Sequence, residues 1–539
     1  MPEETVKTKN NPDEKIIVRC EGHSFYYPIS DILRLITGAV PREQDRTEIP
    51  DQTEHGGFLR TRSEEEWKPG MKEIVCEAEG VVPSGWTILI RSRVSEEVVE
   101  TYLDAAFTSD PPWTRLSKHD MVKRISGPVR ICRSREEIPV PLNREVKRQL
   151  YELLSGMLRR RAPWGSLTGI RPTQVARELL TEEEMTEIYG VRKDKAHLAF
   201  LTRDAEDQVL ENSDPENLHV YIGIPFCPTR CAYCSFVAQE APRKTSLLPS
   251  YVDAMLHEMA LVLPHIPQKV ETLYVGGGTP TVLDETLLQK LMEGITGNSA
   301  FANVKEVCVE AGRPDTITEG KLRVLRKAGI TRICINPQTL CEATLLRVGR
   351  RHTAEDFVRA FEMARSMGFS IINTDLIAGL PGESEEEFCA SMDRILELAP
   401  ENVTVHSLSK KRRSDLLREE ILQKEKEELS SMETMLGYAF SSLTKAGYAP
   451  YYLYKQKDTL GGHENVGYQK DGTPCLYNVA MMSDRRSVLS FGAGGMSKRV
   501  FPGGNGDVRV ERCPCIKDPI QYIEKVEQMA ERKRAFFEG

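Results

Sequence analysis

The sequence has no long hydrophobic run. None of its 539 residues lies in an uninterrupted apolar stretch of about 18 residues, the length that a helix needs to cross a bilayer. The opening fifteen residues, MPEETVKTKNNPDEK, are charged and lack the apolar core of a secretory signal peptide. We therefore expect a cytoplasmic protein without membrane association.

An excess of positive charge is also missing. The chain holds 72 Lys and Arg residues against 80 Asp and Glu residues, which gives a formal net charge of −8. Without a basic field, no general attraction to nucleic acid is expected. Hydrophobic residues make up 40% of the chain, enough for ordinary cores, and at roughly 150 residues per domain the length predicts two to four domains.

The cysteines lack the pattern of a disulfide framework. They number thirteen, an odd count, and are not closely and regularly spaced. Several lie inside apolar runs, where a thiol packs as a small hydrophobic group: Cys20, Cys76, Cys308, Cys334 and Cys389. Cys513 and Cys515 could bind a metal or form a redox pair, but a C-x-C spacing alone is weak evidence, and we assign them to no site.

Three cysteines differ from the others because they lie on one short loop. Cys227, Cys231 and Cys234 form a C-x3-C-x2-C array directly after residues 220–226, an apolar run typical of a buried strand. Thiolates at such intervals can converge on one soft metal centre, and sulfur ligands select zinc or an iron–sulfur cluster.

A fourth ligand is absent from the neighbourhood of this array. A structural zinc site normally has another Cys or His nearby, but Phe236 follows the array and no His lies between Gln239 and Ser250. Three thiolates on a [4Fe–4S] cluster leave one iron open. The segment YIGIPFCPTRCAYC resembles the radical-SAM signature, in which that iron chelates S-adenosylmethionine (SAM). The resemblance implies a [4Fe–4S] cluster and SAM as cofactors.

Strand-like and helical segments alternate from residue 218 onward. Six runs have the character of buried strands: HVYIGIPF, ETLYVGGG, EVCVEAG, RICINPQ, IINTDLIAG and NVTVHSLS. Such alternation predicts a parallel sheet with right-handed crossovers. Six units with polar residues at the strand ends favour an α/β fold, a partial (β/α)6 barrel of the TIM type, over a doubly wound sheet.

A glycine-rich turn follows the second of these strands. Gly276, Gly277 and Gly278 carry no side chains, so backbone groups can come close to a ligand there. A glycine-rich strand end alone is weak evidence, because many are only tight turns. The segment GGGTPT nevertheless resembles the radical-SAM element that binds the methionine amino group.

Polar residues end the next three strands. Glu310, Gln338 and Asp375 lie at the ends of the third, fourth and fifth strands, and Arg350 follows Gln338. Any one of them alone is more often a solvated residue. Because the carboxyl ends of barrel strands share one rim, together they form a ring of donors and acceptors suited to ribose hydroxyls and an amino-acid zwitterion.

A closer family resemblance rests on several segments. LYVGGGTPTVL, NPQTL, LRVGRRHT and DLIAGLPGESEEEF resemble the oxygen-independent coproporphyrinogen III dehydrogenase family, and IGIPFCPTRCAYCSF, WGSLTGIRPTQ and INPQTL resemble its HemZ-type branch. The similarity covers residues 215–500, and more loosely the N-terminal region. It implies that Cys227, Cys231 and Cys234 ligate the cluster and assigns no catalytic side chain. The implied SAM contacts are Tyr221, Tyr233, Gly277, Gly278, Thr279, Glu310, Gln338, Arg350, Asp375, Ser407 and Met496.

Three positions depart from the family pattern. Gly223 stands where the better-studied members have a histidine, Phe236 replaces a further cysteine, and EAGRP replaces E-x-N-P from Glu310 onward. The cluster and SAM are compatible with all three changes. Gly223, however, has no side chain to donate a proton or to contact the second cofactor molecule that those enzymes bind, so the resemblance at this position does not extend to the substrate.

The predicted barrel, residues 216–412, is flanked by two other regions. Residues 1–215 show no repeated βα unit and are predicted as an α+β accessory region, with strands at 16–20 and 23–29 and helices at 30–36 and 95–107. Arg171, on a loop of this region, could grip a carboxylate, or the loop could only dock two regions together.

Residues 413–539 resemble the family's C-terminal lid domain. They are predicted to contain a long helix, a strand at 447–459, a hairpin at 465–482 and a glycine-rich turn at 488–498. The basic run Lys410, Lys411, Arg412 and Arg413 spans the start of this region. It could neutralise substrate propionates, or it could be a solvated helix start.

The resemblance implies a radical-SAM oxidoreductase that acts on a tetrapyrrole. The family reaction converts coproporphyrinogen III to protoporphyrinogen IX and needs a reducing partner such as flavodoxin or ferredoxin. Two alternatives stay open: an anaerobic haem-degrading enzyme of the same fold, and a haem-binding chaperone of the same family. The sequence does not indicate the oligomeric state.

Overall fold

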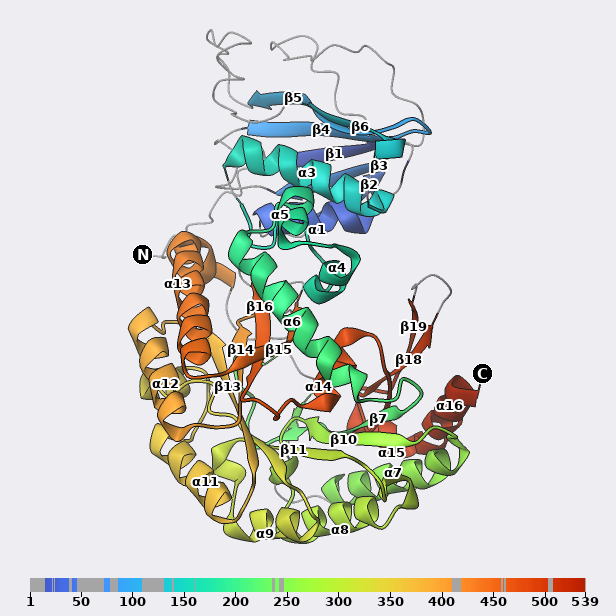
Figure 1. The fold of residues 1–539 in the computed structure, drawn as a ribbon, viewed down its shortest axis with the longest axis vertical. Coiled ribbons are helices and arrows are strands. Elements are labelled where there is room, and N and C mark those ends of the chain that lie inside the picture. Colours follow the sequence, from blue (N-terminus) through green and yellow to red (C-terminus); the bar gives the residue numbers. More distant parts are fainter. Residues whose placement is uncertain are drawn as a thin grey trace, which may run out of the picture. The chain divides into compact units, whose positions relative to one another are not determined.

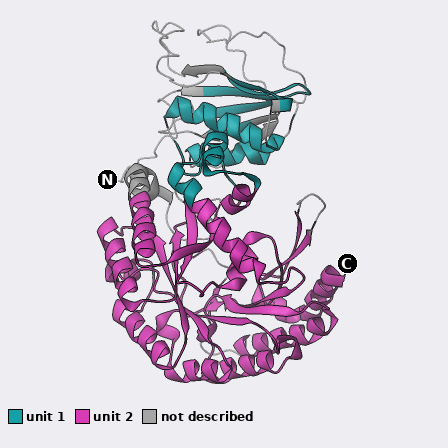
Figure 2. Ribbon diagram, in the orientation of Figure 1, with its two compact units in different colours: residues 1–170, 178–197 teal, residues 171–177, 198–539 magenta. Residues whose placement is uncertain are grey.

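The structure is a computed structural model. It describes residues 15–21, 23, 25–37, 41–45, 72–77, 86–108, 130–137, 140–159, 161–234, 238–241, 247–409, 418–456, 459, 462–502 and 508–538. Phe236 and the basic run 410–413 lie outside these ranges. The chain divides into two compact units, residues 1–170 with 178–197 and residues 171–177 with 198–539 (Figure 2). The finer boundaries after residues 215 and 412 stay predictions.

The first unit is an α+β structure built on a six-stranded sheet, as predicted. The strand order is β2-β3-β1-β4-β5-β6, from β1 (Lys15–Glu21), β2 (Arg42–Asp45), β3 (Lys72–Glu77), β4 (Trp86–Val94), β5 (Val98–Thr108) and β6 (Arg130–Ser134). Strands β1 and β4 are parallel, and the other neighbours are antiparallel. Buried residues of α1 (Tyr26–Thr37) and α3 (Leu142–Leu158) share one core with those of the sheet.

Two elements of this unit differ from the prediction. The sequence predicts a helix over residues 95–107, but β5 begins at Val98, because its β-branched residues fit the pleat between β4 and β6. It predicts a strand over residues 23–29, but α1 begins at Tyr26. Pro28 lies in its first turn, where the missing N–H costs no helical hydrogen bond. The unit also contains α5 (Glu182–Tyr189), capped by the Thr181 side chain, which the sequence did not predict.

The second unit contains the six predicted strands. They are β7 (Leu218–Ile224), β10 (Val270–Gly277), β11 (Glu306–Gly312), β12 (Arg332–Ile335), β13 (Ile371–Ala378) and β14 (Asn402–Ser407). Each is parallel to the next, so all six carboxyl ends lie at one edge. The predicted α/β fold with a partial (β/α)6 barrel is thereby confirmed, because the six strands follow one another in chain order without the switch point of a doubly wound sheet.

Helices connect these strands on the outer side of the sheet (Figure 1). They are α7 (Leu247–Val262), α8 (Glu285–Thr296), α9 (Glu319–Lys327), α10 (Glu342–Arg347), α11 (Ala354–Ser366) and α12 (Glu385–Leu398). Thr353 and Ser384 begin α11 and α12 with reciprocal capping boxes. Two further helices lie mostly in this unit, α4 (Pro172–Glu178) and α6 (Lys193–Glu211).

The C-terminal segments extend the same sheet at both edges. Beside β14 lie β16 (Glu464–Gln469) and β15 (Ala449–Lys455), and beside β7 lie β17 (Ser487–Phe491), β18 (Met496–Pro502) and β19 (Val508–Pro514), which gives eleven strands. The helices of this part are α13 (Arg418–Lys445), α14 (Leu476–Ser483), α15 (Pro519–Glu524) and α16 (Val526–Glu538). No helix among the described residues is both long and apolar enough to cross a membrane.

The predicted hairpin at 465–482 is wrong in its second half. Strand β16 pairs with β15, but helix α14 follows in place of a returning strand. The carboxylate of Glu306 accepts hydrogen bonds from the N–H groups of Leu476 and Tyr477, each at 3.3 Å. Glu306 thus satisfies two N–H groups at the start of α14 that have no partner within the helix. Because Glu306 is remote in sequence, the helix could not be predicted from local residues.

Candidate functional site

The cysteine loop begins where β7 ends, at the carboxyl edge of the parallel strands. Strand β8 (Phe226–Cys227) pairs with β9 (Gln239–Glu240) and closes the base of the loop. The N–H of Cys234 donates to the carbonyl of Cys231 at 3.0 Å, which forms a turn. The Cys231 side chain is buried, and Cys227 and Cys234 are half-buried. The three thiols thus lie on one folded loop.

The donor chemistry of this loop fits an iron–sulfur cluster. Within the part of the chain that the structure describes, no three His, Cys, Asp or Glu side chains are grouped to hold a single metal ion. Burial raises the pKa of the Cys227 thiol to about 11, so ligation by this residue must release a proton. Soft thiol donors suit iron–sulfur chemistry. The ligand role of the three cysteines stays a prediction.

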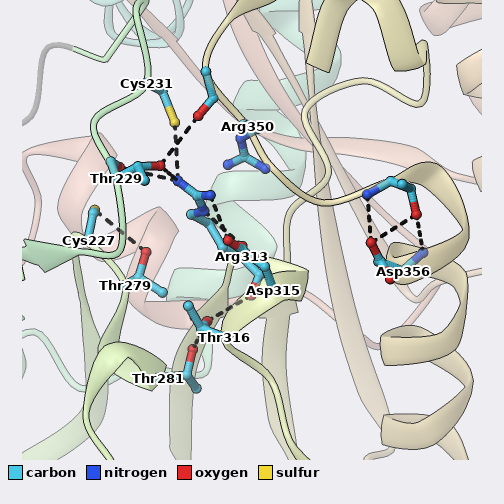
Figure 3. A network of polar contacts seen from close by, with 12 residues as sticks. Cys227, Thr229, Cys231, Thr279, Thr281, Arg313, Asp315, Thr316, Arg350 and Asp356 are labelled. Atoms are coloured by element: carbon cyan, nitrogen blue, oxygen red, sulfur yellow. Dashed lines mark hydrogen bonds and ion pairs between the residues drawn. The ribbon is translucent and has the colours of Figure 1, made fainter. Parts of the chain in front are cut away.

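The glycine turn after β10 is built against the cysteine loop. The N–H of Gly278 donates to the carbonyl of Ile224, and the N–H of Thr279 donates to that of Phe226, each at 2.8 Å. The Thr279 hydroxyl donates to the sulfur of Cys227 at 3.6 Å (Figure 3). A Cβ at Gly278 would lie 2.4 Å from the carbonyl oxygen of Phe226. Only glycine fits there, and turn and loop hold each other in place.

Glu310 lies at the end of β11 beside this turn. Its carboxylate accepts hydrogen bonds from the Tyr274 hydroxyl at 2.7 Å and from the N–H of Gly277 at 3.2 Å. Burial raises the pKa of Glu310 to about 7, and the hydrogen bond from Tyr274 offsets part of that rise. The carboxyl group therefore changes its charge near neutral pH.

Replacing Glu310 with glutamine is expected to remove one component of the pH dependence of stability. The usual pKa of the side chain is 4.5, and the folded protein raises it to about 7. Folding therefore favours the protonated form, and this contribution is lost as the pH rises from about 4.5 through 7. Relative to the wild type, Glu310→Gln should gain roughly 3 kcal/mol between pH 4.5 and pH 8.

Urea unfolding of both proteins at several pH values measures this difference. The exposed Glu319, changed to glutamine, is the control and should leave the pH profile unchanged. A Glu310→Gln profile parallel to that of the wild type would contradict the expected titration.

Asp375 and Gln338 lie together at the neighbouring strand ends. The N–H of Gln338 donates to the carbonyl of Asp375 at 3.0 Å, and the Asp375 carboxylate accepts from the Asn373 amide at 2.7 Å. Gln338 has a φ of 71°, a strained conformation for a residue with a side chain. Its buried Oε1 atom has no hydrogen-bond partner among the described residues. An orphaned acceptor on a strained residue fits a position that binds a ligand.

Arg350 joins the cysteine loop to the end of β12. Its Nε atom donates to the Tyr233 hydroxyl at 3.2 Å, and its Nη1 atom donates to the carbonyl of Asn336 at 2.6 Å. Burial raises the pKa of Tyr233, so its hydroxyl stays protonated. The structure therefore brings these two predicted residues together.

The remaining predicted cofactor residues are held in different ways. The ring of Tyr221 stacks on those of Tyr274 and Tyr477, with centroids 6.2 and 6.1 Å apart. The Ser407 hydroxyl donates to the carbonyl of Glu464 at 2.6 Å, so its proton is already engaged. Met496 begins β18 and is 37% exposed. The cofactor contacts of these residues stay predictions.

The Gly223 position is enclosed by backbone. A Cβ at Gly223 would lie 3.3 Å from the ring of Tyr221 and 3.4 Å from the carbonyl oxygen of Phe491. A Cβ at Gly492 would lie only 2.4 Å from the carbonyl oxygen of Gly223. The Tyr221 ring and the turn after β17 therefore leave little room beside Gly223.

Several polar residues of the site were not predicted from the sequence. His406 lies 3.6 Å from the Asp375 carboxylate through Nε2, and its Nδ1 atom lies 3.3 Å from the Tyr454 hydroxyl. Arg313 contacts the cysteine loop. Arg171, which the sequence suggested could grip a carboxylate, forms an ion pair at 3.0 Å with Asp484 of the same chain.

Comparison with known proteins places this site in a family. Residues 221–395 match the family model described as the radical SAM superfamily. The oxygen-independent coproporphyrinogen-III oxidase-like protein HemZ of Bacillus subtilis is 37% identical over 398 residues, which are 70% of this chain and 77% of that protein. The chain belongs to the HemZ-like family of radical SAM proteins. Its cofactors are accordingly a [4Fe–4S] cluster and SAM.

Other relatives match this HemZ-like protein over shorter stretches. The oxygen-independent coproporphyrinogen III oxidase of Cereibacter sphaeroides is 34% identical over 38% of this chain and 45% of its own length. Heme chaperone HemW of Bacillus subtilis is 36% identical over 35% of this chain and 49% of its own length. The structure of coproporphyrinogen III oxidase (HemN) from Escherichia coli has 23% identity and a TM-score of 0.45, covering 62% of this chain and 73% of that one.

Proposed function

We propose that this HemZ-like protein is a radical SAM oxidoreductase that acts on a tetrapyrrole. The proposed reaction converts two propionates of coproporphyrinogen III into vinyl groups and gives protoporphyrinogen IX. The observation that carries the proposal is the 37% identity to HemZ over 77% of that protein, which is itself named as oxidase-like. The 34% identity to the Cereibacter sphaeroides oxidase supports the same substrate class.

Cys227, Cys231 and Cys234 are the proposed ligands of the cluster. When bound, the cluster and SAM supply a 5′-deoxyadenosyl radical, and the protein positions it and excludes water. In the proposed overall reaction, each propionate would lose one hydrogen atom, CO2 and one electron, and the electron would pass to an external acceptor. The proposed electron donor to the cluster is a flavodoxin or ferredoxin.

The strand ends are proposed to hold SAM. Residues 277–279 are proposed contacts of SAM, although their N–H groups already donate to Glu310, Ile224 and Phe226. The orphaned Oε1 atom of Gln338 can accept from one of its donors. Asp375 and Glu310 can accept from hydroxyl or ammonium groups.

A second candidate is a haem-binding chaperone. The 36% identity to HemW of Bacillus subtilis, a named heme chaperone, favours it. Gly223 favours it too, because no side chain is available there to donate a proton. An anaerobic haem-degrading enzyme is the third candidate, with the same cofactors and a different tetrapyrrole.

Anaerobic turnover separates these candidates. We expect the reduced protein with SAM and coproporphyrinogen III to yield 5′-deoxyadenosine, CO2 and a divinyl product, all of which are lost in Cys231→Ala. Deoxyadenosine without CO2 would retain radical chemistry and reject this substrate. Stoichiometric haem binding without deoxyadenosine under any reductant would favour the chaperone.

A further inference from the structure

Arg313 is a buried cation that contacts the cysteine loop. It follows β11, and only 3% of its surface is exposed. Its Nη1 atom donates to the Thr229 hydroxyl at 2.6 Å and lies 3.9 Å from the sulfur of Cys231, to which it also donates (Figure 3). The backbone carbonyl of Thr229, 3.2 Å away, accepts from the same atom. The guanidinium of Arg313 is thus hydrogen-bonded both to Thr229, in the middle of the loop, and to the thiol of Cys231.

The other side of the guanidinium meets a carboxylate. The Nε and Nη2 atoms donate to the two carboxylate oxygens of Asp315 at 2.9 and 2.7 Å, a bidentate pair. The Asp315 side chain is 25% exposed, whereas that of Arg313 is 3% exposed. Water therefore screens the negative end of the pair more than the positive end. The pair acts as a dipole with its positive end toward Cys231.

The backbone around Arg313 is fixed, so this dipole is preorganised. The Thr316 hydroxyl donates to the carbonyl of Arg313 at 2.8 Å and lies 2.6 Å from the Thr281 hydroxyl (Figure 3). Gly312, which precedes Arg313, has a φ of +69°, and a Cβ there would lie 3.2 Å from the Thr279 side chain. The segment from β11 to Thr316 is therefore tied to the glycine turn.

We infer that Arg313 is a positioning residue that both orders the cysteine loop and raises the reduction potential of the cluster. A reduced cluster carries one more negative charge, and a nearby cation or a hydrogen bond to a ligand sulfur stabilises that state. The inference rests on the proposed ligation by Cys231. It does not depend on the tetrapyrrole substrate.

Two substitutions should move the potential in opposite directions. Arg313→Met removes the cation, so the midpoint potential of the cluster should become more negative, with at least a tenfold shift of the reduction equilibrium, about 59 mV for one electron. Asp315→Asn removes the counter-charge and leaves the cation, so the potential should become more positive. An anaerobic redox titration followed by electron paramagnetic resonance measures both, on clusters reconstituted without SAM.

A structural effect alone gives a different pattern. If Arg313 only supports the loop, both variants lose iron and the remaining cluster keeps its potential, which would overturn the inference. Arg313→Lys, which keeps the charge but not the bidentate pair, should retain a potential closer to that of the wild type than Arg313→Met does.

Arg332 offers a matched control. Its side chain is as buried as that of Arg313, and it forms an ion pair with Glu306 at 3.2 Å. It lies at the amino end of β12, whereas the cysteine loop lies at the carboxyl ends of the strands. Arg332→Met should reduce stability without moving the potential. An unchanged potential in Arg313→Met would reject the inference alone, whereas a wild-type protein that binds no cluster would reject the proposed ligation itself.

Discussion

Replacing any one of Cys227, Cys231 and Cys234 with alanine is expected to abolish cluster binding. Three thiolates on one loop are the minimum that can hold a [4Fe–4S] cluster while leaving an iron open for SAM, and Gln239–Glu240 closes the loop without adding a thiol. Iron and sulfide should fall from one cluster per chain to background after anaerobic reconstitution. The visible absorption of the cluster should disappear with them.

Cys132→Ala is the control for this experiment. Cys132 is an exposed, free cysteine on β6 of the first unit, so its removal should leave the iron content unchanged. Stoichiometric zinc in the wild-type protein, or a full cluster in any of the three single variants, would defeat the proposed ligand set.

Lys533→Met is expected to cause a large loss in the free energy of unfolding. The ammonium group of Lys533 donates to the carboxylate of Glu258 at 2.5 Å, and both side chains are buried. The same carboxylate accepts from the Tyr522 hydroxyl at 2.6 Å and from the N–H of Gly492 at 3.2 Å. Without Lys533, a buried carboxylate keeps its charge unpaired, which costs about 3–5 kcal/mol.

Urea unfolding measures that loss, and Lys290→Met is the matched control. Lys290 forms an ion pair with Asp253, which lies on α7 like Glu258, but both of its members are about half exposed. Removing an exposed pair of this kind costs at most about 1 kcal/mol. Equal losses in the two variants would contradict the assignment of Lys533 to a buried network.

Hydrogen exchange adds a local readout. The Tyr251 hydroxyl donates to the carbonyl of Gly223 at 2.7 Å and accepts from the N–H of Ala493 at 2.8 Å. Helix α16 is therefore connected through Glu258 and the turn after β17 to the strand that precedes the cysteine loop. In Lys533→Met, exchange at Gly492 and Ala493 should become faster.

The sequence predicts the second unit well because its signals are local. Each of the six strands is a mainly apolar run, and intervening helices begin after capping residues such as Thr318, Thr353 or Ser384. Parallel neighbours then follow from the alternation itself. For the same reason, the order of strands and helices along the chain is enough to place the rim residues Glu310, Gln338 and Asp375 on one edge.

Local signals fail where distant partners decide the conformation. Residues 95–107 are compatible with either a helix or a strand. They form a strand from Val98 onward because β5 pairs with β4 and β6. Helix α14 depends on Glu306, a residue of β11. Arg313 appears in the sequence only as a departure from E-x-N-P, because its contact with Thr229 joins segments 84 residues apart. No pattern of spacing predicts such a contact.

The pairing of β7 with β17 has a consequence for synthesis. Strand β7 leads into the cysteine loop, and its two neighbours in the sheet are β10, which follows soon after, and β17 (Ser487–Phe491), which is translated near the end. Every nascent chain shorter than this therefore presents β7 as an open edge strand, with unpaired backbone groups available to other chains. The strand that leads into the cysteine loop is therefore among the last to gain its full set of neighbours, and the loop is synthesised long before its supporting sheet is complete.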